Sequence, residues 1–334
     1  MLKIRRVCVP LGLNCNLHCK YCYRDLEKLD KIPDFSPDMI QYLNNLDPSW
    51  CEAVVASGGE PLLYWDKIKE LFSYTPKDIH KVIMTNGTLL TQEMVNYINQ
   101  NDIEVHLSHD GKMTKFLRGV DIFDDEHLLS LCRQIKTIRT FAVVTSYNND
   151  IWENFFNTIS RLRRKDIFYD TTIVGSNNIE SQQDLLKNFN YDLYFKTLTE
   201  YQCSYYYIKN PYKNGRMLTD NPMTNHKIQG GFNVLPNGII CGMTRICSNY
   251  GSIHLNSYDK LYENIMRTED ISKCKYCELN NFCSAKTNYI SDYTCIFMKK
   301  LAKFYSNKDL INSIKNNINS MLPDIERKYG YIEE

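Results

Sequence analysis

The sequence lacks a long hydrophobic run: none of its 334 residues belongs to a stretch approaching the roughly 18 apolar residues of a membrane-spanning helix. It also lacks an excess of charge of one sign, because 40 basic and 39 acidic residues leave a net charge of +1. With a net charge this small, the chain as a whole has no strong electrostatic attraction for nucleic acid or for a membrane surface. The N-terminus has neither the apolar core nor the cleavage site of a secretory signal. We therefore expect a cytoplasmic protein with no nucleic-acid or membrane partner.

Cysteine, in contrast, is abundant, with 13 residues. In a chain that is not exported the thiols stay reduced, so clustered cysteines indicate metal ligands before disulfides. The odd number also argues against a complete disulfide framework.

Three cysteines near the start, Cys15, Cys19 and Cys22, follow the pattern C-x3-C-x-aromatic-C, with Tyr21 as the aromatic residue. A structural zinc site takes four protein ligands, and a cubane iron–sulfur cluster is normally held by four thiolates. Three thiols on one loop therefore predict a cubane cluster with one iron open to an outside ligand. An open coordination position is typical of a reactive metal site rather than a structural one.

Short β-rich runs alternate with helical patterns through the first two-thirds of the chain, which predicts βαβ units and a parallel sheet. The predicted strands are Val7–Leu11, Ala53–Ser57, Val82–Thr85, Val105–Ser108, Phe141–Ser146 and Thr171–Val174. The predicted helices are Pro37–Leu46, Asp66–Phe72, Gln92–Asn99, Asp125–Ile135 and Ile151–Arg164. Six such units fall short of a closed (β/α)8 barrel. We expect an α/β fold with a partial, TIM-like (β/α)6 barrel.

The polar and glycine-rich segments follow the predicted strands. The Cys loop follows the first strand, Gly58-Gly59-Glu60-Pro61 the second, Asn86-Gly87 the third and Asp110-Gly111 the fourth. Because the carboxyl ends of parallel strands share one edge, these segments should line a common rim.

From about residue 221 the pattern changes. Phe232–Pro236 and Ile239–Gly242 predict a hairpin across Asn237-Gly238, and Met298–Tyr305 and Leu310–Met321 predict closing helices. We divide the chain into a barrel (1–220), a small Cys-rich domain (221–300) and C-terminal helices (301–334). The Cys-rich part contains Cys241, Cys247, Cys274, Cys277, Cys283 and Cys295. Six thiols cannot fill two four-thiolate metal sites. A four-Cys zinc knuckle fits the spacing of four of them.

The Cys15–Cys22 motif and the Gly58–Pro61 motif together resemble those of the radical S-adenosylmethionine (SAM) superfamily. The resemblance implies that Cys15, Cys19 and Cys22 hold a [4Fe–4S] cluster that binds SAM at its open iron. It further implies that the Gly-Gly-Glu segment binds the amino group of SAM and that Tyr21 packs near the adenine. The residues it implies for SAM binding are Tyr21, Gly58, Gly59, Glu60, Asn86, Asp110 and Arg118. Asn-Gly and Asp-Gly are also ordinary turn sequences, so these segments could instead be simple turns. Ser146 is a further candidate for SAM binding, only because it lies at the end of a predicted strand.

The C-terminal spacing Cys274-x2-Cys277-x5-Cys283 resembles the SPASM/twitch subfamily, with Thr287 where relatives have a further Cys. The resemblance implies at least one auxiliary [4Fe–4S] cluster. Its ligands are either Cys274, Cys277, Cys283 and Cys295, or a mixture that includes Cys241 and Cys247. The departure at Thr287 leaves open a second cluster with only three thiolates.

Members of this subfamily with a similar organisation mostly modify peptides or mature sulfatases, and this chain resembles them. The implied function is reductive cleavage of SAM to a 5′-deoxyadenosyl radical, which abstracts hydrogen from a peptide or small-protein substrate. The outcome is oxidative side-chain modification or cross-linking, as in the maturation of ribosomally made peptides (RiPPs). A flavodoxin or ferredoxin is the expected one-electron donor. Because the first strand begins within ten residues of Met1, we expect no N-terminal leader-binding domain.

Two alternatives remain. One is a small-molecule radical SAM dehydrogenase or carbon–carbon bond-forming enzyme. The other, from a different class, is a non-catalytic iron–sulfur redox or zinc-binding module, which leaves Glu60 unexplained. The catalytic base is unknown, with Asp292 and Tyr293, near Cys295, as weak candidates. The substrate, its reacting atom and the oligomeric state do not follow from the sequence.

Overall fold

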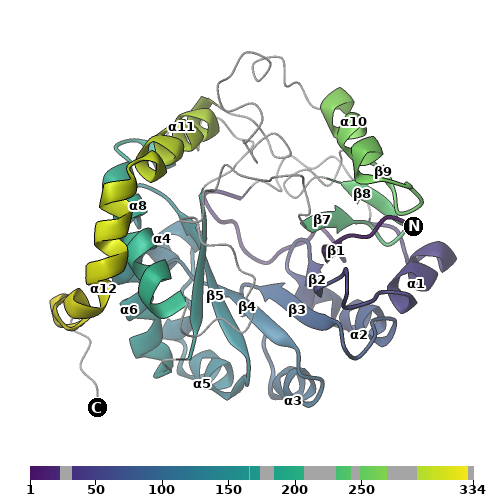
Figure 1. The fold of residues 1–334 in the computed structure, drawn as a ribbon. Helices are drawn as coiled ribbons and strands as arrows, with labels where there is room; N and C mark the ends of the chain where they lie inside the picture. The colour runs from purple at the N-terminus through teal and green to yellow at the C-terminus, as the bar shows by residue number, and fades with distance from the viewer. Residues whose placement is uncertain are drawn as a thin grey trace.

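The computed structural model of the chain describes residues 1–22, 32–164, 166–173, 184–206, 231–241, 249–268 and 292–329. Within these residues, nine strands form one sheet in the order β6-β5-β4-β3-β2-β1-β7-β8-β9. Neighbouring strands from β6 to β7 run parallel, whereas β8 is antiparallel to both β7 and β9. The sheet curves, and α1, α2, α3, α5 and α6 lie along its outer side (Figure 1). The fold is therefore α/β with a mostly parallel, open sheet.

The elements are as follows. The strands are β1 (Arg6–Pro10), β2 (Ala53–Ser57), β3 (His80–Thr85), β4 (Glu104–Ser108), β5 (Ile138–Val144), β6 (Phe168–Ile173), β7 (Gly231–Val234), β8 (Ile239–Cys241) and β9 (Gly251–Ser252). The α-helices are α1 (Pro37–Asn44), α2 (Trp65–Ser73), α3 (Gln92–Gln100), α4 (Thr114–Arg118), α5 (Glu126–Gln134), α6 (Ile151–Leu162), α8 (Tyr191–Tyr201), α10 (Tyr258–Thr268), α11 (Asp292–Ser306) and α12 (Lys308–Lys328).

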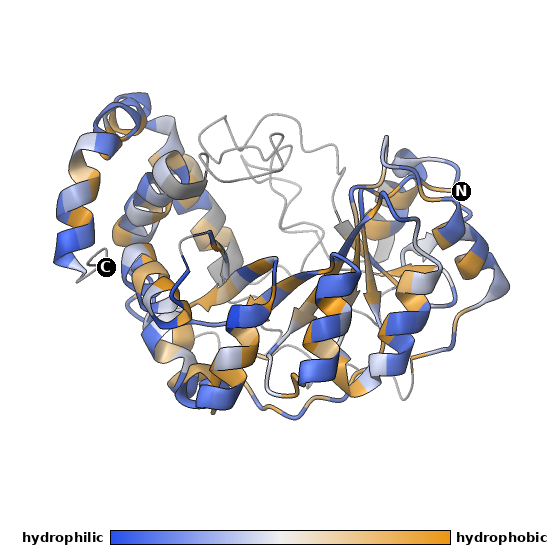
Figure 2. Ribbon diagram, turned by 90° about the horizontal axis from the view of Figure 1, so that it is seen from below, coloured by the Kyte–Doolittle hydropathy of each residue, from blue (hydrophilic) through white to orange (hydrophobic). Residues whose placement is uncertain are grey.

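Local sequence explains where the outer helices begin. Ser36 accepts a hydrogen bond from the Met39 amide at 3.2 Å, and Pro37 occupies the first turn of α1. Thr91 caps α3 through the Met94 amide in the same way. Such caps satisfy backbone N–H groups that have no partner inside the helix. Figure 2 shows hydrophilic and hydrophobic residues mixed along these helices, as expected of helices with one face against a sheet.

The six predicted parallel strands and five predicted helices are all present. The largest deviations are in β5 and β6, which begin at Ile138 and Phe168, each three residues before its predicted start. β5 ends at Val144. Ser146 therefore lies beyond the strand, and its amide donates a hydrogen bond to the Leu185 carbonyl at 2.7 Å. The structure also contains α4, α8 and α10, which the sequence patterns did not indicate.

The predicted C-terminal hairpin joins the main sheet, because β7 pairs in parallel with β1. The predicted closing helices are present and longer than expected, as α11 and α12, and both contact α8. Among the described residues, no helix combines the length and apolar character needed to cross a membrane.

The sheet has two different faces, because side chains alternate along each strand. On the outer face Val7 and Val9 of β1 join the large core between sheet and helices. On the inner face Cys8, Val55 and Val82 form a small apolar cluster. Cys51 and Cys132 are fully buried in the large core and Cys203 packs against it, as expected of small apolar residues.

At the amino ends of the strands, the inner face carries a charged network centred on Glu104. Its carboxylate contacts His80, accepts a hydrogen bond from Arg139 Nε at 2.9 Å and lies 3.1 Å from His106 Nε2. Arg139 also donates to Asp170 at 2.6 Å. Burial alone would raise the pKa of the Glu104 carboxyl, but its contacts with His106, His80 and Arg139 outweigh burial and hold that pKa well below its usual value.

Glu104→Gln should lower the free energy of unfolding by about 3 kcal/mol, because it removes one of the two carboxylates that pair with the buried Arg139 and leaves only Asp170. The lowered pKa means that the ionised carboxylate stabilises the wild type above the unfolded-state pKa of 4.5, and that this contribution is lost as the pH falls. The variant should therefore lose less stability than the wild type in acid. Urea titrations from pH 7 downward measure both effects.

Glu52→Gln, which removes an exposed partner of Arg5, is the matched control and should cost less than about 1 kcal/mol. Equal losses in the two variants would contradict a dominant role for the buried network.

Candidate functional site

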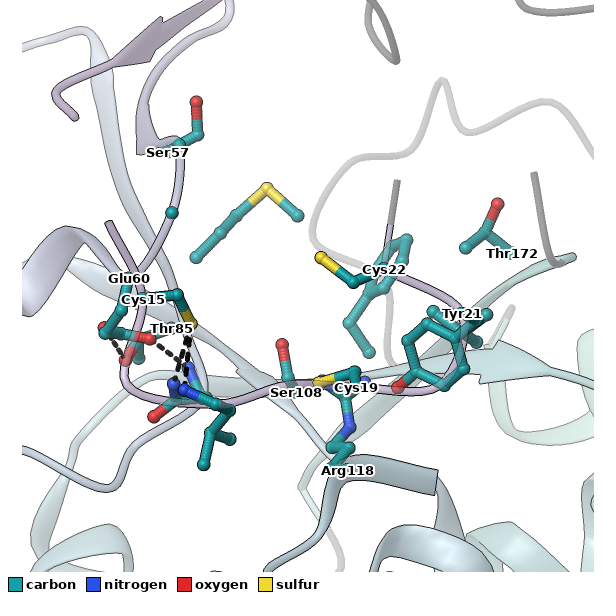
Figure 3. A pocket seen from close by; sticks show the side chains of 17 residues that line it. Cys15, Cys19, Tyr21, Cys22, Ser57, Glu60, Thr85, Ser108, Arg118 and Thr172 are labelled. Atoms are coloured by element: carbon teal, nitrogen blue, oxygen red, sulfur yellow. Dashed lines mark hydrogen bonds between the residues drawn. The ribbon is translucent and has the colours of Figure 1, made fainter. Parts of the chain in front are cut away.

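A cavity of about 250 Å³ opens at the carboxyl ends of the parallel strands, and the Cys loop after β1 forms one of its walls (Figure 3). The residues that line it are Cys15, Leu17, Cys19, Tyr21, Cys22, Ser57, Gly58, Gly59, Glu60, Met84, Thr85, Asn86, Ser108, Arg118, Phe141, Val143 and Thr172. They come from the ends of five strands and from the loops that follow, so the predicted common rim exists.

The Cys loop has an inner and an outer side. Cys15, Leu17, Cys19 and Tyr21 line the cavity, whereas the even-numbered residues from Asn14 to Lys20 are exposed. Inward and outward side chains thus alternate from Asn14 to Tyr21. Cys22 also lines the cavity, so all three thiols of the motif point to one space. Thiolates are the usual ligands of cubane clusters, and the donor set therefore fits the cluster that the motif implies.

The loop is fastened to the turn after β2. The Gly59 amide donates to the Gly12 carbonyl at 2.7 Å, and the Glu60 amide to the Asn14 carbonyl at 2.8 Å. Gly58 has φ +120°, and a Cβ there would lie 2.4 Å from the Gly12 oxygen. Only glycine accepts both that conformation and that close approach.

Glu60 connects the second and third strand ends. Its side chain is 1% exposed and accepts hydrogen bonds from the Leu62 amide (3.1 Å), the Thr85 hydroxyl (2.6 Å) and the Asn86 amide (2.8 Å). Asn86 in turn donates through Nδ2 to Asn16 at 3.0 Å and lies 3.8 Å from the Cys15 sulfur. The carboxylate, the amide and the first thiol thus form one continuous hydrogen-bonded unit.

Asp110 fastens the other end of the Cys loop. Its fully buried carboxylate accepts hydrogen bonds from the Tyr21 hydroxyl (2.5 Å), from Arg118 (2.7 and 3.1 Å) and from the Val143 amide (2.8 Å). The Arg118 guanidinium also lies 5.3 Å from the centre of the Tyr21 ring. Asp110 does not line the cavity, whereas Tyr21 and Arg118 do. Its side chain therefore holds the two lining residues in place from behind.

Burial changes the protonation of this part of the site. It raises the pKa of the Cys19 thiol to about 11, although the nearby Arg118 acts in the opposite direction. Burial alone would lower the pKa of Arg118, but Asp110 more than compensates and the pKa is raised. A metal binds the thiolate, so metal binding at Cys19 must release a proton.

The structure brings together most of the residues predicted from the sequence: the three thiols, Tyr21, the Gly58–Glu60 segment, Asn86 and Arg118. Asp110 lies behind the cavity wall, and Ser146 is not among the lining residues. Cys241 lies in β8 and Cys295 in α11, which begins with Asp292 and Tyr293. Cys247, Cys274, Cys277 and Cys283 lie outside the described residues.

Sequence reasoning missed the wall opposite the Cys loop. Met84, Ser108, Phe141, Val143 and Thr172 all occupy inner-face positions near the carboxyl ends of β3 to β6. These residues could have been found by counting every second residue back from the end of each predicted strand, because side chains alternate between the two faces of a sheet.

Comparison with known proteins gives a consistent result. Residues 9–188 match the family described as "Radical SAM superfamily". An uncharacterised protein of Methanocaldococcus jannaschii is 36% identical over 104 residues, which cover 29% of this chain and 35% of that protein. A cysteine-type anaerobic sulfatase-maturating enzyme of Clostridium perfringens is 27% identical over 160 residues, covering 41% of this chain and 43% of the enzyme. The matches thus span less than half the length of these relatives.

Two solved structures are similar over most of the chain. The enzyme anSMEcpe with bound AdoMet and Cp18Cys peptide has a TM-score of 0.60 at 19% identity, covering 93% of this chain and 99% of that one. SuiB of Streptococcus suis bound to its precursor peptide SuiA has a TM-score of 0.58 at 18% identity, covering 88% and 76%. At these identities the similarity shows a shared fold.

Asp110→Asn should destabilise the folded protein by about 3 kcal/mol and reduce the iron bound after anaerobic reconstitution, because Arg118 loses its buried counter-charge and Tyr21 its charged acceptor. Chemical denaturation and iron analysis measure the two effects. Asp124→Asn is the control: Asp124 also lies between β4 and β5, but 47% of its side chain is exposed where it pairs with Lys115 and Arg161. If Asp110→Asn kept full stability and iron content and weakened SAM binding alone, Asp110 would be a SAM contact instead of a fastening residue.

Proposed function

The chain belongs to the radical SAM superfamily, and we propose that it cleaves SAM reductively and oxidatively modifies or cross-links a side chain of a peptide or small protein. The observation that carries this proposal is the convergence of three thiols from one loop on a cavity that also contains Glu60. A purely structural metal site needs four protein ligands and no adjacent buried carboxylate.

In this proposal Cys15, Cys19 and Cys22 hold a [4Fe–4S] cluster. When bound, the cluster and SAM supply the C–S bond cleavage and a 5′-deoxyadenosyl radical. The chain orients these groups: Asn86 Nδ2 and the Leu17 amide lie 3.8 and 3.4 Å from the Cys15 sulfur, and such hydrogen bonds tune the reduction potential of a cluster.

The lining residues suit the different parts of SAM. Glu60 accepts a hydrogen bond from the amino group, and the Gly58-Gly59 backbone permits close approach. The Arg118 guanidinium pairs with the carboxylate of SAM, while Tyr21, held by Asp110, packs near the adenine. Asn86 completes the binding surface beside the first thiol.

A peptide substrate is supported by the fold shared with anSMEcpe and SuiB, whose structures contain bound peptides. We further propose at least one auxiliary [4Fe–4S] cluster. Its candidate ligands are Cys241, Cys247, Cys274, Cys277, Cys283 and Cys295. Such a cluster would accept an electron from the substrate radical, and a flavodoxin or ferredoxin would supply electrons to the first cluster.

Cys19→Ala should abolish formation of 5′-deoxyadenosine and reduce bound iron from about eight to about four per chain, because it removes one ligand of the SAM-binding cluster and leaves the auxiliary one. Anaerobic reconstitution, iron analysis and product detection with SAM and dithionite measure this. Cys132→Ala, at a buried cysteine of α5, is the matched control. Retained SAM cleavage in Cys19→Ala would contradict the ligand assignment, and about four irons in the wild type would contradict the auxiliary cluster. Absence of 5′-deoxyadenosine from fully loaded wild type would contradict the proposed function.

Glu60→Gln should weaken SAM binding about tenfold or more, because a neutral amide replaces a charged acceptor of the ammonium group. Calorimetric titration of the reconstituted protein with SAM gives the affinity. Glu70→Gln alters an exposed glutamate of α2 and should bind SAM like the wild type. Wild-type affinity in Glu60→Gln would remove Glu60 from the SAM site.

A further inference from the structure

Around Cys19, the Cys loop has one side facing the cavity and the other side exposed. Cys19 lines the cavity, while its neighbours His18 and Lys20 are exposed. A molecule that contacts His18 and Lys20 therefore lies on the other side of the loop backbone from the Cys19 thiol. This arrangement follows from the alternation of inward and outward side chains along the Cys loop.

Next to that outer side lies an exposed aromatic pair. Phe116 in α4 is 45% exposed and Tyr147, after β5, is 49% exposed, with ring centres 5.0 Å apart. The Lys20 ammonium lies 4.5 Å from the centre of the Phe116 ring, and the Lys20 amide donates to the Leu117 carbonyl at 2.8 Å. We call Lys20, Phe116 and Tyr147 the outer patch.

The outer patch has the composition of a protein-binding surface. Large aromatic side chains are enriched in interfaces and carry much of their binding energy. The neighbouring Lys112 and Lys115 also keep more than half of their side chains exposed, although each pairs with a carboxylate. The ammonium groups favour an acidic partner, because complementary charge speeds and orients association.

We propose that the outer patch docks an acidic one-electron carrier protein, whose flavin or iron–sulfur centre then faces the outer side of the Cys loop. This inference rests on the proposed function, which requires an electron at the cluster held by Cys15, Cys19 and Cys22. The carrier is oxidised by one electron, that cluster is reduced by one electron, and no bond forms or breaks in this step.

The test compares Lys20→Glu and Phe116→Ala with the wild type. Lys77→Glu is the control, because Lys77 is an exposed lysine that precedes β3, at the amino ends of the parallel strands and away from the Cys loop. Binding of an oxidised, acidic flavodoxin to the reconstituted enzyme is measured by calorimetry at low and high salt. Reduction of the cluster is followed by absorbance, with the reduced flavodoxin in one series and dithionite in the other.

We expect Lys20→Glu and Phe116→Ala each to raise the Kd for flavodoxin about tenfold or more. High salt should weaken binding of the wild type more than that of Lys20→Glu. Both variants should be reduced more slowly by flavodoxin and at the wild-type rate by dithionite, with wild-type iron content. Lys77→Glu should match the wild type throughout.

Unchanged flavodoxin affinity in both variants would overturn the docking proposal. So would an equal loss of rate with dithionite, since the patch would then act through assembly of the cluster. Weaker binding of a peptide substrate, with flavodoxin binding intact, would assign the surface to the substrate instead. Failure of the wild type to cleave SAM with dithionite tests the proposed function separately, because dithionite needs no docking surface.

Discussion

The site depends on how the Cys loop is fastened at both ends. The loop has no regular secondary structure, so its backbone finds partners on the rim: Gly12 and Asn14 accept from Gly59 and Glu60, and Lys20 donates to Leu117. The buried Asp110 then holds Tyr21, one residue before the last thiol. Because these contacts lie on either side of Cys15 and Cys19, they hold the loop in the conformation that turns the thiols to one side. Loss of either fastening would free the loop to rotate.

Most of the fold could be predicted from the sequence, because alternation, caps and turn residues are local signals. Ser36 and Thr91 cap the helices as their positions suggested. The start of β5 could not be predicted in this way. Arg139 places a charge in a strand whose inner side is buried, and that charge is tolerated only because Glu104 and Asp170 lie on the neighbouring strands. This compensation comes from residues on other strands, so the sequence around Arg139 does not reveal it.

The residues of the site show the same difference between features with a local sequence signal and features that depend on tertiary contacts. Residues with a local motif, such as the thiols and Glu60, were found together in the cavity. Asp110 carried an Asp-Gly motif that indicated the rim but not the direction of its side chain, which the contact with Tyr21, 89 positions away in the sequence, determines. Phe141 and Thr172 carry no motif, and their place in the wall depends on the register of β5 and β6.

One structural rule, the alternation of side chains along an extended chain, sets the chemistry at three places. In the strands it puts Val7 and Val9 into the helix-covered core and Cys8 on the inner face. On that inner face it places both the charged network at the amino ends and the cavity lining at the carboxyl ends. In the Cys loop it turns the thiols inward and Lys20 outward. The same residue spacing that gathers the sulfurs also leaves their neighbours His18 and Lys20 exposed, so that the sulfurs lie close to the surface. A reactive site that must receive electrons from outside requires that closeness, whereas a structural metal site gains nothing from it.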